Sequence, residues 1–527
     1  MAIDLLRAYA QRAHAKMSRV VLKWIIAPML AGYLVSMFLG GGAFAQALGV
    51  MVGLALFSWL AWRKVQAWRG PKAGHDDLPN VHKAVQLGQA MQRPAYRAEV
   101  MIEHAEKSKE IWVGATWRRV KKGIARDVPV MLSRDQLRKN HVAVLGTSGT
   151  GKTVAVTSLL VQAMRLGDAV VCIDPKSDQF AAGILMREAQ ALGRPAAFVD
   201  LRQPVPQINI FKGAGRAEVE VLMTTALGLE PTGDPGVDHY RAEDRDGLAS
   251  LLDVITPEQT SLKGMVSVGS NMSEVTDRTS LWRNLKDLAR LEALATLEGP
   301  DLAAVIAAGG LVYVVGAVDD LRVQAAQKAV LTRIVQIIKN RPRQGARHVH
   351  LFADEFKYCI GSTALRALGT IRDQGATVYL AFQSYGDLHD AQGLPVQAVI
   401  GAVKQNAPLK LVFRIEDDAT ARELSSLSGQ YAVQTETTSK TTTSDGLEQG
   451  SYMHTMRALV TPDQLSTAMP KPQNATEAPV FWLFGHGVPV LCAAGYMSPG
   501  EQPQVTPAPP LPTTGAADNN TNAQALI

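Results

Sequence analysis

The chain has 527 residues, which at about 150 residues per domain predicts three or four structural units. Its 54 Lys and Arg residues exceed its 48 Asp and Glu residues, so the formal net charge is +6, which permits a polyanionic partner without requiring one. Because 47% of the residues are hydrophobic, the composition excludes a globally disordered chain.

The N-terminal part predicts a membrane anchor, because residues 24–62 contain no Asp, Glu, Lys or Arg. About 20 residues span a bilayer, so this run predicts two transmembrane helices, roughly at residues 21–39 and 43–62, separated by three glycines. Lys and Arg flank both spans, which predicts that both ends are cytoplasmic and that the three glycines lie outside. A signal peptide cleaved near residues 43–45 is the alternative, although a second apolar span follows it directly.

A nucleotide-binding motif follows the apolar stretch at residues 141–145 and precedes a helical run at residues 154–166. The sequence GTSGTGKT matches the G-x-x-x-x-G-K-[ST] pattern, in which backbone N–H groups and a helix N-terminus bind phosphate. Lys152 is expected to contact the β- and γ-phosphates, and Thr153 to ligate Mg²⁺. The residues expected to bind ATP are Gly146, Thr147, Ser148, Gly149, Thr150, Gly151, Lys152 and Thr153.

A second buried strand, predicted over residues 348–353, ends in Asp354 and Glu355. Asp354 is expected to hold the magnesium ion, and Glu355 to polarise the attacking water as a general base. The two histidines of this strand, His348 and His350, are expected to be satisfied sheet residues rather than metal ligands.

Two further catalytic candidates follow along the chain. Gln383 ends a strand predicted over residues 377–382, a position that faces the ligand crevice of an open α/β sheet, so it could sense the γ-phosphate. Arg372 ends a helical segment and could reach a neighbouring subunit's nucleotide as an arginine finger, or form a surface ion pair. The expected catalytic residues are therefore Glu355, Arg372 and Gln383.

Strands that alternate with helices predict a doubly wound, largely parallel α/β sheet. Further strands are predicted at residues 169–174, 197–200, 311–316, 409–414 and 480–484, whereas residues 433–451 are expected to form an exposed hairpin or loop. The predicted units are a membrane anchor (1–69), a juxtamembrane segment with the first part of the nucleotide domain (70–213), an inserted all-α domain (214–300), the second part of the nucleotide domain (301–498) and a disordered tail (499–527).

Basic residues cluster at residues 118–122 and 339–347, where they could contact a phosphate backbone, although a solvated surface is the simpler reading. The first cluster could equally face anionic lipid. No sequence-reading DNA motif is present, so any nucleic-acid contact is expected to be independent of sequence. The three cysteines lie far apart and are expected to be buried, inert thiols.

The combination of motifs resembles the coupling proteins of conjugation and type IV secretion, the TraG/TraD/TrwB class. The resemblance covers most of residues 20–495 and includes the anchor, the phosphate-binding loop and the DE and QS pairs. It also includes Ile173-Asp174-Pro175-Lys176, VFRIED at residues 412–417 and LVTPDQL at residues 459–465.

The resemblance implies a hexameric inner-membrane motor with a RecA-like P-loop domain that hydrolyses ATP with Mg²⁺. It implies DNA binding without sequence preference, and contacts with a relaxase or relaxosome, with inner-membrane components of the secretion channel and with membrane lipid. It places Arg372 at the arginine-finger position, with Arg414 as the second candidate.

Three departures from the family pattern are visible. Ser177 stands where the family usually has glycine, the helical insert is short, and the tail lacks an acidic run, which predicts no contact between the tail and a relaxosome partner. Two other functions remain open: a coupling ATPase that recruits only protein effectors, and an FtsK-type chromosome translocase. A membrane scaffold with a vestigial ATPase is disfavoured by the intact Lys152, Asp354 and Glu355.

Overall fold

The computed structural model describes residues 91–120, 123–391, 394–438 and 450–511, all of which belong to one compact unit, His82–Ile527. Both predicted transmembrane helices lie outside these residues. Among the helices that the structure does describe, none combines the length and the apolar character that crossing a bilayer requires.

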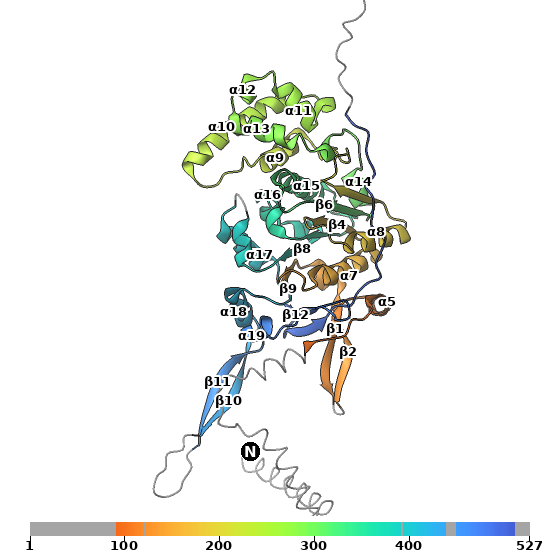
Figure 1. The fold of residues 1–527 in the computed structure, drawn as a ribbon, viewed down its shortest axis with the longest axis vertical. Helices are drawn as coiled ribbons and strands as arrows, with labels where there is room; N and C mark the ends of the chain where they lie inside the picture. Colours follow the sequence, from red (N-terminus) through yellow and green to blue (C-terminus); the bar gives the residue numbers. More distant parts are fainter. Residues whose placement is uncertain (1–90, 121–122, 392–393, 439–449, 512–527) are drawn as a thin grey trace, which may run out of the picture. The chain divides into compact units, whose positions relative to one another are not determined.

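The central feature is an 11-stranded sheet with the strand order β2-β1-β13-β12-β9-β3-β8-β7-β4-β6-β5 (Figure 1). The seven strands from β9 to β5 in this order are parallel, which confirms the predicted α/β class. These strands are β3 (Val142–Leu145), β4 (Ala169–Asp174), β5 (Ala196–Asp200), β6 (Leu311–Val315), β7 (Val349–Ala353), β8 (Ala376–Phe382) and β9 (Leu409–Val412).

Helices cover both faces of the parallel strands, so alternate side chains of each strand enter different cores. In β3, Ala143 and Leu145 pack into one core, and Val142 and Val144 into the other. A strand that is buried on both faces has no polar side, which explains why the sequence predicts these strands as continuous apolar runs.

The core of Val142 and Val144 is covered by α5 (Ala98–Ser108), α7 (Lys152–Arg165) and α8 (Ala181–Ala191). The opposite core is covered by α9 (Arg216–Ala226), α15 (Leu321–Asn340), α16 (Ser362–Ala367), α17 (Val396–Asn406) and α18 (Asp418–Leu427). The short α6 (Arg134–Arg138) and α19 (Pro462–Leu465) begin with capping boxes at Ser133 and Thr461. Single turns of 3-10 helix lie at Phe356–Tyr358, Ile371–Gln374 and Gly386–Asp390.

The remaining four strands extend the sheet in antiparallel fashion, and three of them were not predicted. They are β1 (Glu110–Val120), β2 (Gly123–Ser133), β12 (Val480–Phe484) and β13 (Val490–Ala493). Only β12 was predicted as a strand: glycine, proline or charged residues interrupt the apolar runs of β1 and β2, and β13 has only four residues.

Between β5 and β6 the structure contains only helices, and α10 to α13 gather in one group (Figure 1). Besides α9, this stretch holds α10 (Pro235–Val254), α11 (Leu262–Gly269), α12 (Ser273–Thr276), α13 (Thr279–Leu288) and α14 (Leu302–Ala307), with 3-10 turns at Pro257–Gln259 and Glu292–Leu294. Asp234, with Pro235 at the first helical position, caps the start of α10.

A separate two-stranded ribbon consists of β10 (Gln430–Thr438) and β11 (Gly450–Ala458), paired in antiparallel register (Figure 1). The predicted hairpin at residues 433–451 coincides with this ribbon, and its tip lies outside the described residues.

The C-terminal segment, residues 496–511, differs from the flexible tail that the composition predicts after residue 498. It has no regular secondary structure, yet it is anchored along the domain. The Arg187 side chain donates to the Pro499 carbonyl at 2.7 Å, and the Thr296 hydroxyl donates to the Pro509 carbonyl at 2.6 Å. Side chains of α8 and of the stretch between β5 and β6 thus donate hydrogen bonds to the backbone of this segment and hold it in place. Residues 512–527 lie outside the described residues.

Alanine substitutions at two helical glycines test this anchoring, because the added methyl group would contact the C-terminal segment at one position and nothing at the other. A Cβ at Gly183 in α8 would lie 2.6 Å from the Glu501 carbonyl oxygen, whereas a Cβ at Gly401 in α17 would meet nothing within 4 Å. Gly401→Ala should therefore raise the free energy of unfolding by about 1 kcal/mol through helix propensity. Gly183→Ala should lose that gain and release the C-terminal segment, and faster cleavage at Glu501 by a glutamate-specific protease would report the release. Equal cleavage of both variants would contradict the anchoring.

Candidate nucleotide-binding site

The predicted phosphate-binding loop lies between β3 and α7, at the carboxyl edge of the parallel sheet. Lys152 begins α7, and Gly151, with φ 92°, is its N-cap residue. A Cβ at Gly151 would lie 2.3 Å from Cβ of Pro479, so both the backbone angle and the close approach require glycine. The local sequence therefore forms the strand–loop–helix geometry of a P-loop.

The Lys152 side chain is folded back onto its own loop and is only 7% exposed. Its ammonium group donates to the carbonyl oxygens of Gly146 and Thr147, the latter at 3.3 Å. Burial lowers the pKa of Lys152, and the carboxylates of Asp354 and Glu355 partly oppose that shift. A polyanion that replaces the loop carbonyls would offset the desolvation of this charge.

Two buried carboxylates, Asp354 and Glu355, follow β7 as predicted, and they are 5% and 1% exposed. Burial, with the nearby charges of Asp174 and Glu355, raises the pKa of Asp354 to about 7. Glu355 has φ 40° and ψ 57°, a left-handed conformation that costs a residue other than glycine about 1–3 kcal/mol. The surrounding structure therefore holds the Glu355 carboxylate in a strained position at the sheet edge.

A third buried carboxylate, Asp174 at the end of β4, holds the next turn of the chain in place. It accepts hydrogen bonds from the backbone N–H groups of Lys176, Ser177 and Asp178, at 3.0, 2.9 and 2.7 Å, and from the Tyr313 hydroxyl. Burial raises its pKa. The turn is therefore a rigid platform for the side chains that it carries.

Ser177, which stands where the resemblance expects glycine, has φ 58°. This left-handed conformation is the one that glycine adopts without a steric penalty, so the geometry gives the physical reason for the family preference. The serine keeps the turn because three hydrogen bonds to Asp174 fix it.

Lys176 joins three elements of the site, a contact that no sequence pattern predicts. Its ammonium group donates to the Glu355 carboxylate and, at 3.0 Å, to the Ser148 hydroxyl of the P-loop. β4 and β7 pair in parallel with Ile173 opposite Ala353, so the ends of the two strands must lie side by side. The sheet therefore places this lysine next to the glutamate.

These groups surround a cavity of about 310 Å³. Its polar lining comprises the P-loop residues from Ser148 to Thr153, together with Lys176, Asp178, Asp354 and Glu355. Val154, Pro472, Pro479 and Tyr496 form the remaining wall. The cavity thus combines backbone N–H groups and two lysines with carboxylates, the set of groups that a phosphate chain with a divalent cation requires.

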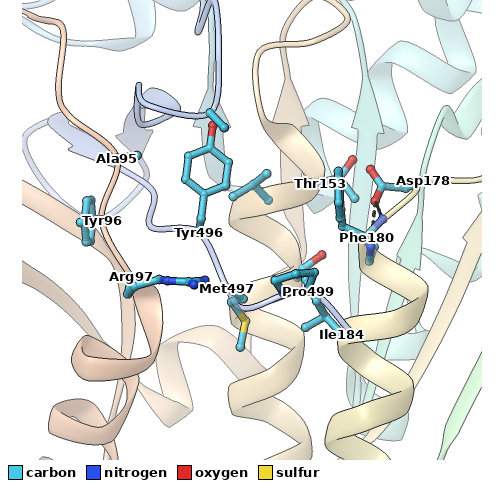
Figure 2. Close-up of a pocket in the computed structure, with 14 residues that line it drawn as sticks. Ala95, Tyr96, Arg97, Thr153, Asp178, Phe180, Ile184, Tyr496, Met497 and Pro499 are labelled. Atoms are coloured by element: carbon cyan, nitrogen blue, oxygen red, sulfur yellow. Dashed lines mark hydrogen bonds between the residues drawn. The ribbon is translucent and has the colours of Figure 1, made fainter. Parts of the chain in front are cut away.

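A second, mostly apolar pocket of about 440 Å³ shares Thr153, Val154, Asp178 and Tyr496 with the first. Figure 2 shows that its labelled residues come from separate elements: Tyr96 and Arg97 from the chain before α5, Thr153 from α7, Phe180 and Ile184 from the start of α8, and Tyr496, Met497 and Pro499 from the C-terminal segment. Aromatic and apolar walls beside a phosphate cavity suit a flat heteroaromatic ring.

Gln383 and Arg372 lie at opposite ends of β8, Gln383 at the carboxyl end of the strand and Arg372 before its amino end. Gln383 follows β8, between the ends of β3 and β7, and its backbone N–H donates to Asp387 at 3.1 Å, but it does not line the cavity described above. Arg372 precedes β8, so it lies at the amino edge, far from the nucleotide site of its own chain. It is half-exposed and 3.6 Å from the Asp373 carboxylate.

Arg414 lies closer to the P-loop of its own chain, since its carbonyl oxygen accepts from the Thr147 N–H at 2.9 Å. Its guanidinium is 3.7 Å from the Glu416 carboxylate. Within one chain, therefore, Arg414 and not Arg372 is near the site.

The remaining polar candidates serve the fold. His348 pairs with the Thr377 hydroxyl, and His350 with Tyr379 and Asp168, so both histidines have hydrogen-bond partners within the fold. All three cysteines are buried and free, as predicted. Arg341 and Arg347 of the 339–347 cluster donate to backbone carbonyls of neighbouring loops, a structural role that neither predicted alternative, phosphate contact or solvated surface, anticipated. The side chains of the 118–122 cluster lie outside the described residues.

Comparisons with known proteins identify the same regions. The family described as "TraM recognition site of TraD and TraG" matches residues 348–471, and "Helicase HerA, central domain" matches residues 121–212. Mobilization protein A of Escherichia coli is 30% identical over 312 residues, which cover 57% of this chain and 56% of that protein. The chain thus spans little more than half the length of this curated relative.

Solved structures of the bacterial conjugative coupling protein TrwB have a similar fold. TrwBdeltaN70 in its unbound monoclinic form is 17% identical with a TM-score of 0.53, and the match covers 79% of this chain and 94% of that chain. TrwB in complex with ADP and Mg²⁺ is 17% identical with a TM-score of 0.51, over 80% and 95% of the two chains. Together with the sequence matches, these structures confirm the resemblance to the coupling-protein family of conjugation and type IV secretion.

Sequence reasoning missed two sets of residues in this site. The contact of Lys176 with Glu355 was missed because it joins residues far apart in sequence, although the Asp174-Pro175-Lys176 motif marked the place. The walls contributed by Tyr96 and Tyr496 carry no motif at all, and only the three-dimensional fold brings them to the P-loop.

Proposed function

We propose that the chain is an ATP-driven coupling protein of a conjugative type IV secretion system, which links a relaxase–DNA complex to the secretion channel and pumps DNA. The observation that carries the proposal is the convergence of the P-loop with Asp354 and Glu355 at one sheet edge. That site lies in a chain that matches the TraD and TraG family and adopts the fold of TrwB.

In the proposed complex, the triphosphate of ATP lies in the cavity of the P-loop and the base in the adjoining apolar pocket. TrwB structures contain ADP with Mg²⁺ and a non-hydrolysable ATP analogue, which supports this choice of ligand. Thr153 and Asp354 would hold the Mg²⁺, because both line the cavity and a divalent cation relieves the cost of a buried carboxylate. The ion neutralises charge on the phosphates.

Glu355 is assigned the general-base role, because its carboxylate is fixed beside the cavity by its backbone. Gln383 is assigned a γ-phosphate-sensing role from its position between the P-loop and β7. Arg372 acts on a neighbouring subunit, in keeping with its position at the opposite edge of the sheet, and this role requires the hexamer.

The remaining parts of the proposal concern partners. An inner-membrane location rests on the two apolar spans of the sequence. A relaxosome partner is supported by the matched TraM recognition family and by the similarity to Mobilization protein A. DNA binding without sequence preference, secretion-channel contacts and lipid contacts follow from the family resemblance.

Hydrolysis of ATP by the full-length chain, with and without single- and double-stranded DNA, tests the proposal. Lys152→Ala should lower ATP affinity and abolish turnover, because the phosphates lose their main cationic ligand. Glu355→Gln should retain affinity and lower turnover by about 10²- to 10⁴-fold, the usual contribution of a general base.

DNA stimulation that disappears in Lys152→Ala would support a translocating motor. Activity that depends on Lys152 but is indifferent to DNA would instead favour a coupling ATPase for protein effectors. Turnover unaffected by both substitutions would contradict the assigned site.

Complementation between two inactive variants tests the role of Arg372. Arg372→Ala chains keep an intact nucleotide site, and Lys152→Ala chains keep the arginine, so each lacks what the other supplies. Each variant alone should be inactive, and a mixture of the two should recover part of the wild-type ATPase rate. If Arg372 forms only a surface ion pair with Asp373, the Arg372→Ala variant will be active by itself.

A further inference from the structure

The ammonium group of Lys176 lies within the nucleotide cavity, but its partner is a carboxylate of the protein. It donates to Glu355 and to Ser148 Oγ, and the Glu355 side chain, which is 1% exposed, has this lysine as its ion-pair partner. The residue assigned as general base is thus paired with a cationic side chain of the protein.

Neither backbone at this ion pair has freedom to move. The turn that carries Lys176 is held by three N–H hydrogen bonds to Asp174, and Glu355 is held in its left-handed conformation after β7. The Lys176 side chain lines the cavity, is 39% exposed and is flexible about four carbon–carbon bonds. A change of partner at this site therefore needs movement of side chains and no shift of the backbone.

The terminal phosphate of a nucleoside triphosphate would compete with Glu355 for this lysine. Ser148, the other partner of Lys176, belongs to the loop that surrounds the phosphates, so the ammonium group already lies where that loop meets β4 and β7. A diphosphate lacks the terminal group and would leave the lysine on Glu355. The two ligands therefore differ in whether Glu355 is paired.

We propose that Lys176, beside the role assigned to Gln383, distinguishes triphosphate from diphosphate: it pairs with Glu355 until a terminal phosphate takes its ammonium group and frees the carboxylate for catalysis. This inference rests on the proposed nucleotide site and deepens it. Lys152 holds the phosphate chain in both ligand states, whereas Lys176 contacts only the group that hydrolysis removes.

The test compares the affinities of the full-length chain for AMP-PNP and ADP, each measured with Mg²⁺ by displacement of a fluorescent ADP analogue. Lys176→Met should weaken AMP-PNP binding by about tenfold or more, the usual value of a charge-assisted hydrogen bond, and change ADP binding by less than about twofold. Lys176→Arg, which keeps the charge and the donors, should restore most of the preference for AMP-PNP.

Lys471→Met provides the matched control, because Lys471 lies beside Gly149 at the tip of the P-loop without touching Glu355. Loss of this charge should weaken both nucleotides to the same degree. Thermal unfolding of each variant in the absence of nucleotide shows whether the fold is retained.

Equal weakening of AMP-PNP and ADP in Lys176→Met would overturn the proposal and leave Lys176 as a structural ion pair. A wild-type chain that binds neither nucleotide would overturn the proposed function itself. The two failures are thus distinguishable in a single experiment.

Discussion

The balance of buried charge at the carboxyl edge of the sheet is the constraint on which the rest of the site depends. Parallel pairing of β4 with β7 brings three buried carboxylates together, and only two lysines, Lys152 and Lys176, lie among them in the described cavity. Burial raises the pKa of Asp174 and of Asp354 and lowers that of Lys152, so each charged form is destabilised without additional partners. A phosphate chain bound with a divalent cation supplies both kinds of partner at once.

Elements far from the P-loop in sequence complete this edge. Pro479 packs against Gly151, and Tyr496 lines both the phosphate cavity and the apolar pocket. From Tyr496 the C-terminal segment continues along α8 to Pro206 and Thr296, at the ends of the helical stretch between β5 and β6. The segment from Tyr496 to Pro509 thus connects the nucleotide pocket with the stretch between β5 and β6.

The sequence was sufficient for those parts of the fold that depend on local patterns. The buried parallel strands are continuous apolar runs, so their positions were predicted closely. The P-loop and the Asp354–Glu355 pair are local motifs, and of the predicted P-loop residues Ser148 to Thr153 line the cavity whereas Gly146 and Thr147 do not. The antiparallel strands β1, β2 and β13 were missed because charged residues, glycine or proline interrupt the first two and the third has only four residues. The anchoring of residues 499–511 was missed because it depends on hydrogen bonds to distant backbone, which composition does not encode.

The same distinction applies to the site. Sequence patterns predicted which residue types would surround the phosphates, but not which side chains would pair. Lys176 contacts Glu355 because β4 and β7 are neighbours in the sheet, a fact of topology. Topology also separates residues that the sequence grouped together. Arg372 and Glu355 were both predicted to be catalytic, but the position of Arg372 before β8 places it away from the site of its own chain.

Photolabelling of the full-length chain with 8-azido-ATP and Mg²⁺, followed by mapping of the labelled peptides, tests directly where the nucleotide binds. Labels are expected on peptides that contain Tyr96, Phe180 or Tyr496, which line the apolar pocket beside the P-loop. Unlabelled ATP should displace the label, and Lys152→Ala should reduce it. Labels elsewhere in the chain, or labels in this pocket that persist in excess ATP, would contradict a nucleotide site at the carboxyl edge of the sheet.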